Sequence, residues 1–149
     1  ASDPDRDTGD GTFLFDNGST EILMGIAQMP HSWKLESNIN PHIHWCPTNT
    51  DTGDVRWRFE YDIAKVNGTF AGAYTSIDVD DAGDGTAEKH QRAYFAAVSM
   101  TGYDTISAII KWKISRIGGS DTYNADARLL EFDIHYEMDT IGSREELSK

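Results

Sequence analysis

The sequence predicts an all-β protein, an antiparallel eight-stranded jelly roll or β-sandwich that ends in a short C-terminal helical turn. Two observations predict this class. Apolar residues recur with a period of two in the clearest segments, which is the period of a half-buried strand. Clusters rich in Gly, Asn and Asp, such as DNGS, PTNTDTGD and DDAGDG, separate these segments and favour turns.

Three segments alternate most clearly between apolar and polar residues, and we expect their apolar faces to form the core. In residues 55–63 the apolar face consists of Val55, Trp57, Phe59, Tyr61 and Ile63. In residues 129–138 it consists of Leu130, Phe132, Ile134, Tyr136 and Met138. In residues 106–115 it consists of Ile106, Ala108, Ile110, Trp112 and Ile114.

Five weaker segments complete the eight predicted strands: residues 12–15, 21–29, 40–46, 73–79 and 91–100. Residues 1–11 are acidic and polar, and we expect a flexible arm there. Residues 12–149 then form a single jelly-roll domain without an internal repeat. At the C-terminus, Ser143 and Glu146 in SREELSK fit a capping box, which predicts the helical turn.

The charge of the chain bears on its partners. Among 149 residues, 25 are acidic and 13 are basic, so the formal charge is −12 at pH 7. Phosphate backbones repel such a chain, and we expect no nucleic-acid partner. No run of about 18 apolar residues is present, so the sequence predicts no transmembrane helix and no membrane partner. The single cysteine excludes an intrachain disulfide.

The stretch NINPHIHWCP places His42 and His44 one residue apart. Alternation puts both imidazoles on the polar face of this strand. His135 lies on the polar face of another strand, between Asp133 and Glu137. If the two strands are neighbours, three imidazoles and two carboxylates converge. Such a set of ligands suits zinc or another transition metal.

An enzymatic interpretation of this strand is a cupin, a jelly roll that holds its metal with a His-x-His strand. The similarity ends at His-x-His: no Glu follows in WCPTNTDTGD, and Pro-x-Gly followed by His is absent. A metal site formed by His42, His44 and His135 therefore remains the alternative. The interpretation we favour is a pair of polar-face histidines at a subunit contact, with no catalytic residue, no metal and no cofactor.

Other candidate sites have simpler interpretations. Cys46 shares a strand face with His44, but no oxyanion-hole motif accompanies it, so we interpret it as inert. The Asp-rich loops at residues 3–11 and 79–85 lack the register of a calcium loop and are interpreted as solvated turns. Trp33 lies in the loop PHSWK, where we expect it to be exposed. An exposed Trp there would bind sugar or pack against another subunit, and the second is the more common role.

The order of four segments is informative in combination. MPHSWKLESNINPHIHW, GDVRWRFEYDIAKVNGTF, GTAEKHQ and DTYNADARLLEFDIHYEMDTIGSREE follow one another from about residue 15 to the C-terminus. This order resembles a family of small structural proteins from tailed bacteriophages and prophages. The resemblance implies a virion component without enzymatic activity, made in the bacterial cytoplasm and located on the surface of the particle.

Small jelly-roll proteins of tailed phages commonly act in two places. On the head they are trimeric cement or decoration proteins that bridge major capsid subunits, and on the tail they are trimeric knobs of fibres or needles that bind a receptor or glycan. We favour the head, because the chain has no heptads or Gly-x-y repeats for a fibre shaft. We therefore expect a homotrimer whose further partner is the major capsid protein. The residues predicted at its subunit interface are His42, His44, Asp133, His135, Glu137 and Trp33.

Overall fold

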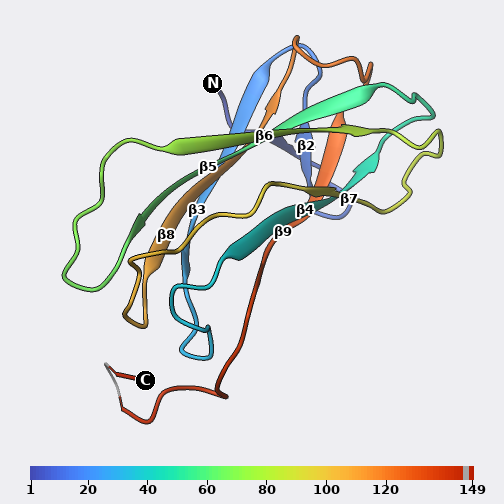
Figure 1. Cartoon of the computed structure of the whole chain (residues 1–149). Helices are drawn as coiled ribbons and strands as arrows, with labels where there is room; N and C mark the ends of the chain where they lie inside the picture. Colours follow the sequence, from blue (N-terminus) through green and yellow to red (C-terminus); the bar gives the residue numbers. More distant parts are fainter. Residues whose placement is uncertain (146–147) are drawn as a thin grey trace.

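The computed structural model describes residues 1–145 and 148–149, and every regular element within them is a β-strand (Figure 1). The strands are β1 (Asp5–Arg6), β2 (Phe13–Phe15), β3 (Thr20–Gln28), β4 (Ile39–Pro47), β5 (Asp54–Ala64), β6 (Thr75–Ala82), β7 (Gln91–Tyr94), β8 (Ile109–Ile117) and β9 (Ala127–Tyr136). They form a five-stranded sheet in the order β1-β2-β9-β4-β7 and a four-stranded sheet in the order β3-β8-β5-β6. The predicted antiparallel β-sandwich is confirmed.

The strands pair in a nested order. β2 pairs with β9, β3 with β8, β4 with β7, and β5 with β6. The chain therefore follows the path of one long hairpin that is folded over on itself. The pairings β4–β9 and β5–β8 then join neighbouring hairpin arms into the two sheets.

The core lies between the sheets and is rich in aromatic side chains. Trp57 of β5 is at its centre, with ring centroids 5.3 Å from Phe15 and 6.1 Å from Trp45. The predicted apolar face of β5 is confirmed, since Val55, Trp57, Phe59 and Ile63 are buried. Burial of each side chain of this size contributes roughly 1.5–3 kcal/mol.

The apolar face predicted for residues 129–138 is wrong at Leu130 and at Met138, which lies beyond the end of β9 and is 60% exposed. Leu130 is 42% exposed, whereas Leu129 is buried in the core. His44 is paired with Glu131 and Trp45 with Leu129, so Leu130 is an extra residue opposite this step of β4. A β-bulge of this kind reverses the alternation of the strand. Strict alternation through the segment consequently assigned Leu130 to the wrong face.

Strand β7 is shorter than the predicted 91–100 segment. It ends at Tyr94, although the Phe95 N–H still donates to Pro41 O at 3.1 Å. Pro41 has no N–H to return a bond to this neighbour, and the ladder stops there. Three apolar residues after the strand end, Phe95, Val98 and Met100, nevertheless reach the core.

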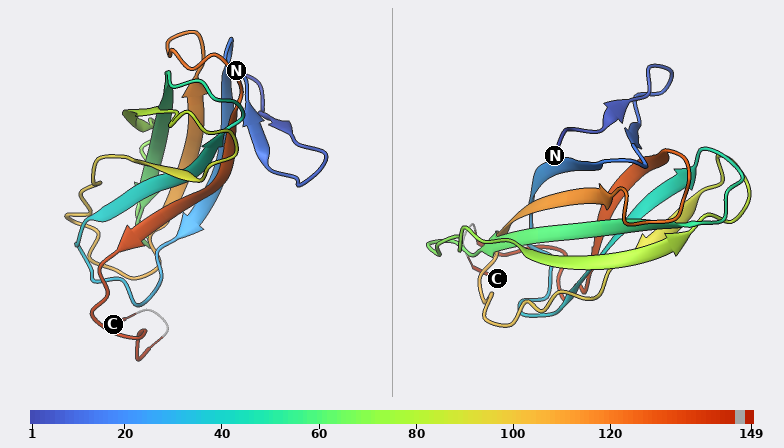
Figure 2. Two further views of the ribbon diagram at one scale, coloured as in Figure 1. Left: turned by 90° about the vertical axis from the view of Figure 1, so that its right-hand side faces the viewer. Right: turned by 90° about the horizontal axis from the view of Figure 1, so that it is seen from above.

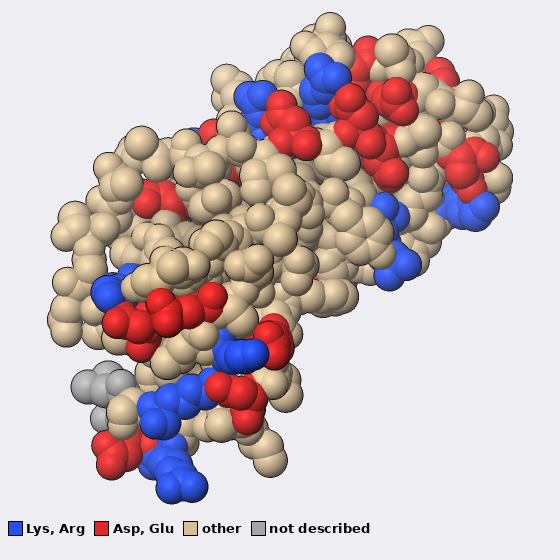
Figure 3. Space-filling view, viewed as in Figure 1, with Lys and Arg blue, Asp and Glu red and all other residues tan. Residues whose placement is uncertain are grey.

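Ion pairs cover part of the outer face of the four-stranded sheet. Arg56 of β5 donates to Asp80 of β6 with Nε at 2.7 Å and Nη2 at 2.8 Å, and Arg58 donates to Asp78 in the same way at 2.6 and 2.7 Å. Figure 3 shows acidic and basic side chains gathered mostly toward the two ends of the molecule, often side by side. Many of the acidic groups therefore have a basic neighbour despite the net charge.

Residues 1–11 include the short strand β1, which pairs with β2 at the edge of the five-stranded sheet. Figure 2 shows this β1–β2 hairpin projecting from the sandwich. Arg128 of β9 holds the connecting loop, since its Nη1 is 2.9 Å from Asp7 Oδ2 and 3.2 Å from Asp10 Oδ2. The expectation that these residues form a flexible arm stays a prediction, and β1 was not predicted.

Residues 1–145 and 148–149 contain no helix. The helical turn predicted for SREELSK is not observed in them, and Glu146, the second residue of its capping box, lies outside the described residues. A search of the described part of the chain finds no helix with the length and apolar character needed to cross a membrane.

Candidate metal centre

Four of the five histidines of the chain lie together on the outer face of the five-stranded sheet. We call this surface the histidine face. Its residues come from β4, β7, β9 and the loop before β7, and they are His42, His44, His90, Tyr94, Asp133 and His135. The sequence left open whether the strands carrying His42 and His135 are neighbours, and the β4–β9 pairing shows that they are.

Strand register positions the central imidazole of this face. Within the ladder, His42 is directly opposite Asp133 on one side and Tyr94 on the other. The neighbouring residues Ile43 and Trp45 are buried in the core, so both histidines of β4 point to the outer face as predicted.

His42 is only 2% exposed although it points away from the core. The ring of Tyr94 stacks on it at a centroid distance of 5.4 Å, and the ring of His135 meets it edge-on at 4.5 Å. The imidazole is therefore enclosed by side chains of both neighbouring strands and has little freedom to rotate.

Three polar atoms converge beside this imidazole. His42 Nε2 is 3.6 Å from Asp133 Oδ2, and His135 Nε2 is 3.5 Å from the same oxygen. One ligand atom from each of these residues lies within 4.8 Å of the other two. The sequence suggested that three imidazoles and two carboxylates would converge here. The structure brings together His42, Asp133 and His135, whereas His44 and Glu137 do not belong to this group.

His44 lies on the other side of His42. Its Nε2 is 3.1 Å from His42 Nε2, and its Nδ1 is 2.6 Å from His90 Nε2. Burial is the main reason that the pKa of His44 is lowered, and the neighbouring imidazoles of His42 and His90 lower it further. His44 is consequently disposed to be a neutral imidazole that links His42 to His90.

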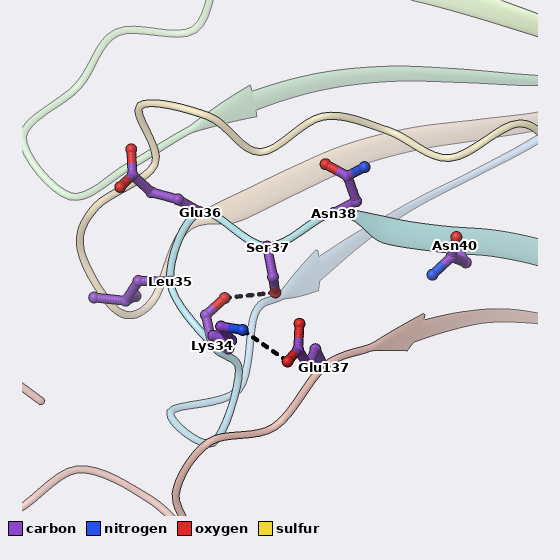
Figure 4. Close-up of a pocket in the computed structure, with 7 residues that line it drawn as sticks. All are labelled: Lys34, Leu35, Glu36, Ser37, Asn38, Asn40 and Glu137. Atoms are coloured by element: carbon purple, nitrogen blue, oxygen red, sulfur yellow. Dashed lines mark hydrogen bonds and ion pairs between the residues drawn. The ribbon is translucent and has the colours of Figure 1, made fainter.

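Glu137 and Trp33, two other predicted interface residues, are placed differently. Glu137 forms an ion pair with Lys34 at 2.7 Å and lines an open polar hollow of about 590 Å³ (Figure 4). Trp33 is fully buried, and its Nε1–H donates to Ser37 O at 3.2 Å. The expectation that Trp33 is exposed is wrong, because the loop supplies a carbonyl that lets the indole enter the core.

Cys46 has the environment of an inert thiol. Its Sγ is 3.6 Å from Glu88 Oε2, and burial together with this carboxylate raises its pKa to about 11. A nucleophilic cysteine requires the opposite shift of its pKa.

The acidic loop at residues 3–11 was considered as a calcium site. Asp7 and Asp10 bind the guanidinium of Arg128, so a side chain supplies the positive charge there.

Sequence reasoning did not find His90 and Tyr94. His90 lies in the loop GTAEKHQ, and Tyr94 lies in a segment with weak alternation. They join the histidine face only because β7 pairs with β4, and no local pattern in the sequence specifies that pairing.

Comparisons of the chain with protein-family models, with curated proteins and with solved structures gave no match. The resemblance to phage virion proteins thus rests on the sequence segments alone.

Proposed function

We propose that this chain is a non-enzymatic structural protein of a tailed-phage virion, a homotrimeric cement protein that bridges major capsid subunits on the head. The observation that carries the proposal is the nested pairing of eight strands, from β2–β9 to β5–β6. Without the short edge strand β1, each sheet has four strands, in the orders β2-β9-β4-β7 and β3-β8-β5-β6. Two four-stranded sheets connected in this way are typical of a jelly roll, a fold common in viral capsid proteins. The fold supports this function by analogy with capsid proteins of the same plan.

Two further features support a structural role over catalysis. The space between the sheets is filled by large side chains such as Trp45, Trp57 and Phe59, so the interior leaves no room for a substrate. The hollow lined by Lys34 and Glu137 contains the ion pair of these residues, and its lining residues include no nucleophile with an adjacent base. Catalytic sites normally combine a concave pocket with such a pair of groups.

The histidine face supplies the proposed subunit contact. Tyr94 is 54% exposed at its centre, beside the imidazoles of His42 and His135. Aromatic side chains on an open sheet face are typical of protein interfaces. Around a threefold axis each of these residues would occur in all three subunits.

Sedimentation equilibrium of the full chain tests the assembly. The expected species has three times the chain mass of 16.6 kDa. Tyr94→Glu should convert it to monomer by placing charges at the contact. Ile26→Glu is the matched control, because Ile26 is 70% exposed on β3 of the opposite sheet. A monomeric wild-type chain, or dissociation by Ile26→Glu alone, would refute this interface.

Cryo-electron microscopy of the phage that encodes the chain tests the location. Density between capsomers on the head is the expected result. Density at the tip of the tail would replace the cement proposal by the alternative of a receptor- or glycan-binding knob. Particles without the protein would refute the virion assignment altogether.

A further inference from the structure

We infer that the histidine face binds one divalent transition-metal ion of the zinc class through His42 Nε2, His135 Nε2 and Asp133 Oδ2. The three residues come from adjacent, hydrogen-bonded strands, and one ligand atom of each lies within 4.8 Å of those of the other two. Two imidazoles and one carboxylate form a ligand set that zinc uses when its fourth position is open to water. The inference stands apart from the proposed virion role, because all three ligands belong to one chain.

The distances match those of a coordination shell. In a tetrahedral site with bonds of about 2.0–2.1 Å to nitrogen and about 2.0–2.2 Å to oxygen, adjacent ligand atoms are about 3.3–3.5 Å apart. The observed separations are 3.6 Å from His42 Nε2 to Asp133 Oδ2 and 3.5 Å from His135 Nε2 to the same oxygen. These two separations differ from the tetrahedral values by no more than a few tenths of an ångström, and the two imidazoles offer nitrogens within 4.8 Å of each other.

Hydrogen bonding explains these same contacts less well. Bonds from an imidazole N–H to a carboxylate oxygen are normally about 2.7–2.9 Å long when either group is charged. Separations of 3.5 and 3.6 Å exceed that range, although Asp133 has imidazoles on both sides. One carboxylate oxygen equidistant from two imidazole nitrogens, and bonded closely to neither, is the arrangement expected around a shared cation.

The site is held rigidly by its surroundings. β4 is paired on both sides, and the ring of His42 is enclosed by Tyr94 and His135. Ligands fixed on paired strands lose little freedom when an ion binds, which favours affinity. The ion would also replace the contact that His42 Nε2 makes with His44 Nε2 at 3.1 Å.

Charge around the site also favours a cation. Glu131 precedes Asp133 by two residues on β9 and is paired with His44 across the ladder. The chain as a whole carries a formal charge of −12. A divalent ion bound here is attracted by local carboxylates and by the net charge of the protein.

Isothermal titration of the untagged, chelator-treated full chain with Zn²⁺ tests the inference, with native mass spectrometry to count ions per chain. We expect one Zn²⁺ per chain, and no comparable binding of Ca²⁺, which prefers sites with only oxygen ligands. Asp133→Asn should weaken Zn²⁺ binding by at least about 10–100-fold, the loss typical even for residues behind the ligands. Glu137→Gln is the matched control, because it removes the same charge four residues along the chain and should leave the affinity unchanged.

A second pair of variants tests the histidine ligand. His135 is 65% exposed at its side chain, so His135→Gln should fold, and it should lose Zn²⁺ affinity to a similar extent. His31→Gln is the control, since His31 binds Ser107 and Ser143 away from the histidine face. Thermal melts check folding independently, because Zn²⁺ should raise the melting temperature of wild type and the controls but not of the two ligand variants.

Co²⁺ provides a readout of geometry. A tetrahedral Co²⁺ site absorbs visible light far more strongly than an octahedral one, and the intense spectrum should disappear in Asp133→Asn. Absence of bound Zn²⁺ in the wild type, or equal affinities of Asp133→Asn and Glu137→Gln, would overturn the inference. A trimer without Zn²⁺ would refute only the metal site, and a monomer with Zn²⁺ would refute only the proposed assembly.

Discussion

Replacing Arg116 with methionine is expected to lower the free energy of unfolding by about 3–5 kcal/mol. Arg116 of β8 is fully buried, and its guanidinium donates to Asp121 with Nε at 2.7 Å and Nη2 at 3.2 Å. It also donates to three carbonyl oxygens, those of Phe15, Tyr123 and Ala125, at 3.0, 2.7 and 2.6 Å. One side chain thus ties β8 to the other sheet and to the loop before β9.

The magnitude follows from what the substitution leaves behind. Methionine fills much of the space of the arginine stem, so little cavity is formed. The carboxylate of Asp121, only 2% exposed, loses its counter-ion, and three buried carbonyls lose a donor. An uncompensated buried charge accounts for most of the 3–5 kcal/mol expected when one partner of such a pair is removed. Because small domains are stable by about 5–15 kcal/mol, the variant should still fold.

Urea unfolding followed by tryptophan fluorescence measures the effect, with Arg56→Met as the control. Arg56 makes a bidentate pair with Asp80 of similar geometry, but their side chains are 40% and 43% exposed. Solvent screening limits such a pair to about 0.2–1 kcal/mol. Both variants are measured at the same protein concentration. An equal decrease in the free energy of unfolding for Arg116→Met and Arg56→Met would show that burial does not decide how much these ion pairs contribute.

Three further predictions concern other parts of the sandwich. Leu129→Ala should lower the free energy of unfolding by about 2–5 kcal/mol and Leu130→Ala by less than about 1 kcal/mol, as measured by urea unfolding; the reverse order would contradict the bulge in β9. Cys46, with its pKa raised to about 11, should react with iodoacetamide at pH 8 roughly 100-fold more slowly than a free thiol, and a normal rate in mass spectrometry would contradict its environment. Hydrogen bonding to Arg58 lowers the pKa of Asp78 below its ordinary value of 3.8, so this pair stabilises the fold above that pH and loses its effect as the pH falls through the lowered pKa. Asp78→Asn should therefore reduce the loss of stability on acidification below pH 4, and an unchanged slope of stability against pH would exclude this linkage.

Strands with uninterrupted alternation were predicted well from the sequence. β5 is the clearest case, because its alternate residues from Val55 to Ile63 face the core in register with both neighbours. β9 shows the limit, since a bulge depends on the pairing partner and leaves no local signal in LLEFDIHYEM. The burial of Trp33 was missed for a related reason. A polar loop predicts exposed side chains, but the carbonyl of Ser37 that accepts from the indole N–H is brought into position only when the loop folds.

The candidate site was only partly predictable. The polar faces of two strands suggested that His42, His135 and Asp133 would meet if the strands were neighbours, and they are. Which histidines would actually converge depended on the register, which places Asp133 rather than Glu137 opposite His42. Arg116 was not recognised at all, because a charged residue at the end of a strand is normally solvated.

The nested order of the strands has a consequence for how the protein is made. During synthesis β2 emerges well before its partner β9, which begins only at Ala127. β3 must similarly wait for β8, so the local pairings open to the growing chain before β8 emerges are the hairpins β1–β2 and β5–β6 and the pairing of β4 with β7. Long-range pairings of this kind form slowly and leave edges unpaired in the meantime. The apolar segments of β2 and β3 thus lack their partners on the ribosome until β9 and β8 have been translated, and a chaperone would find its binding sites there.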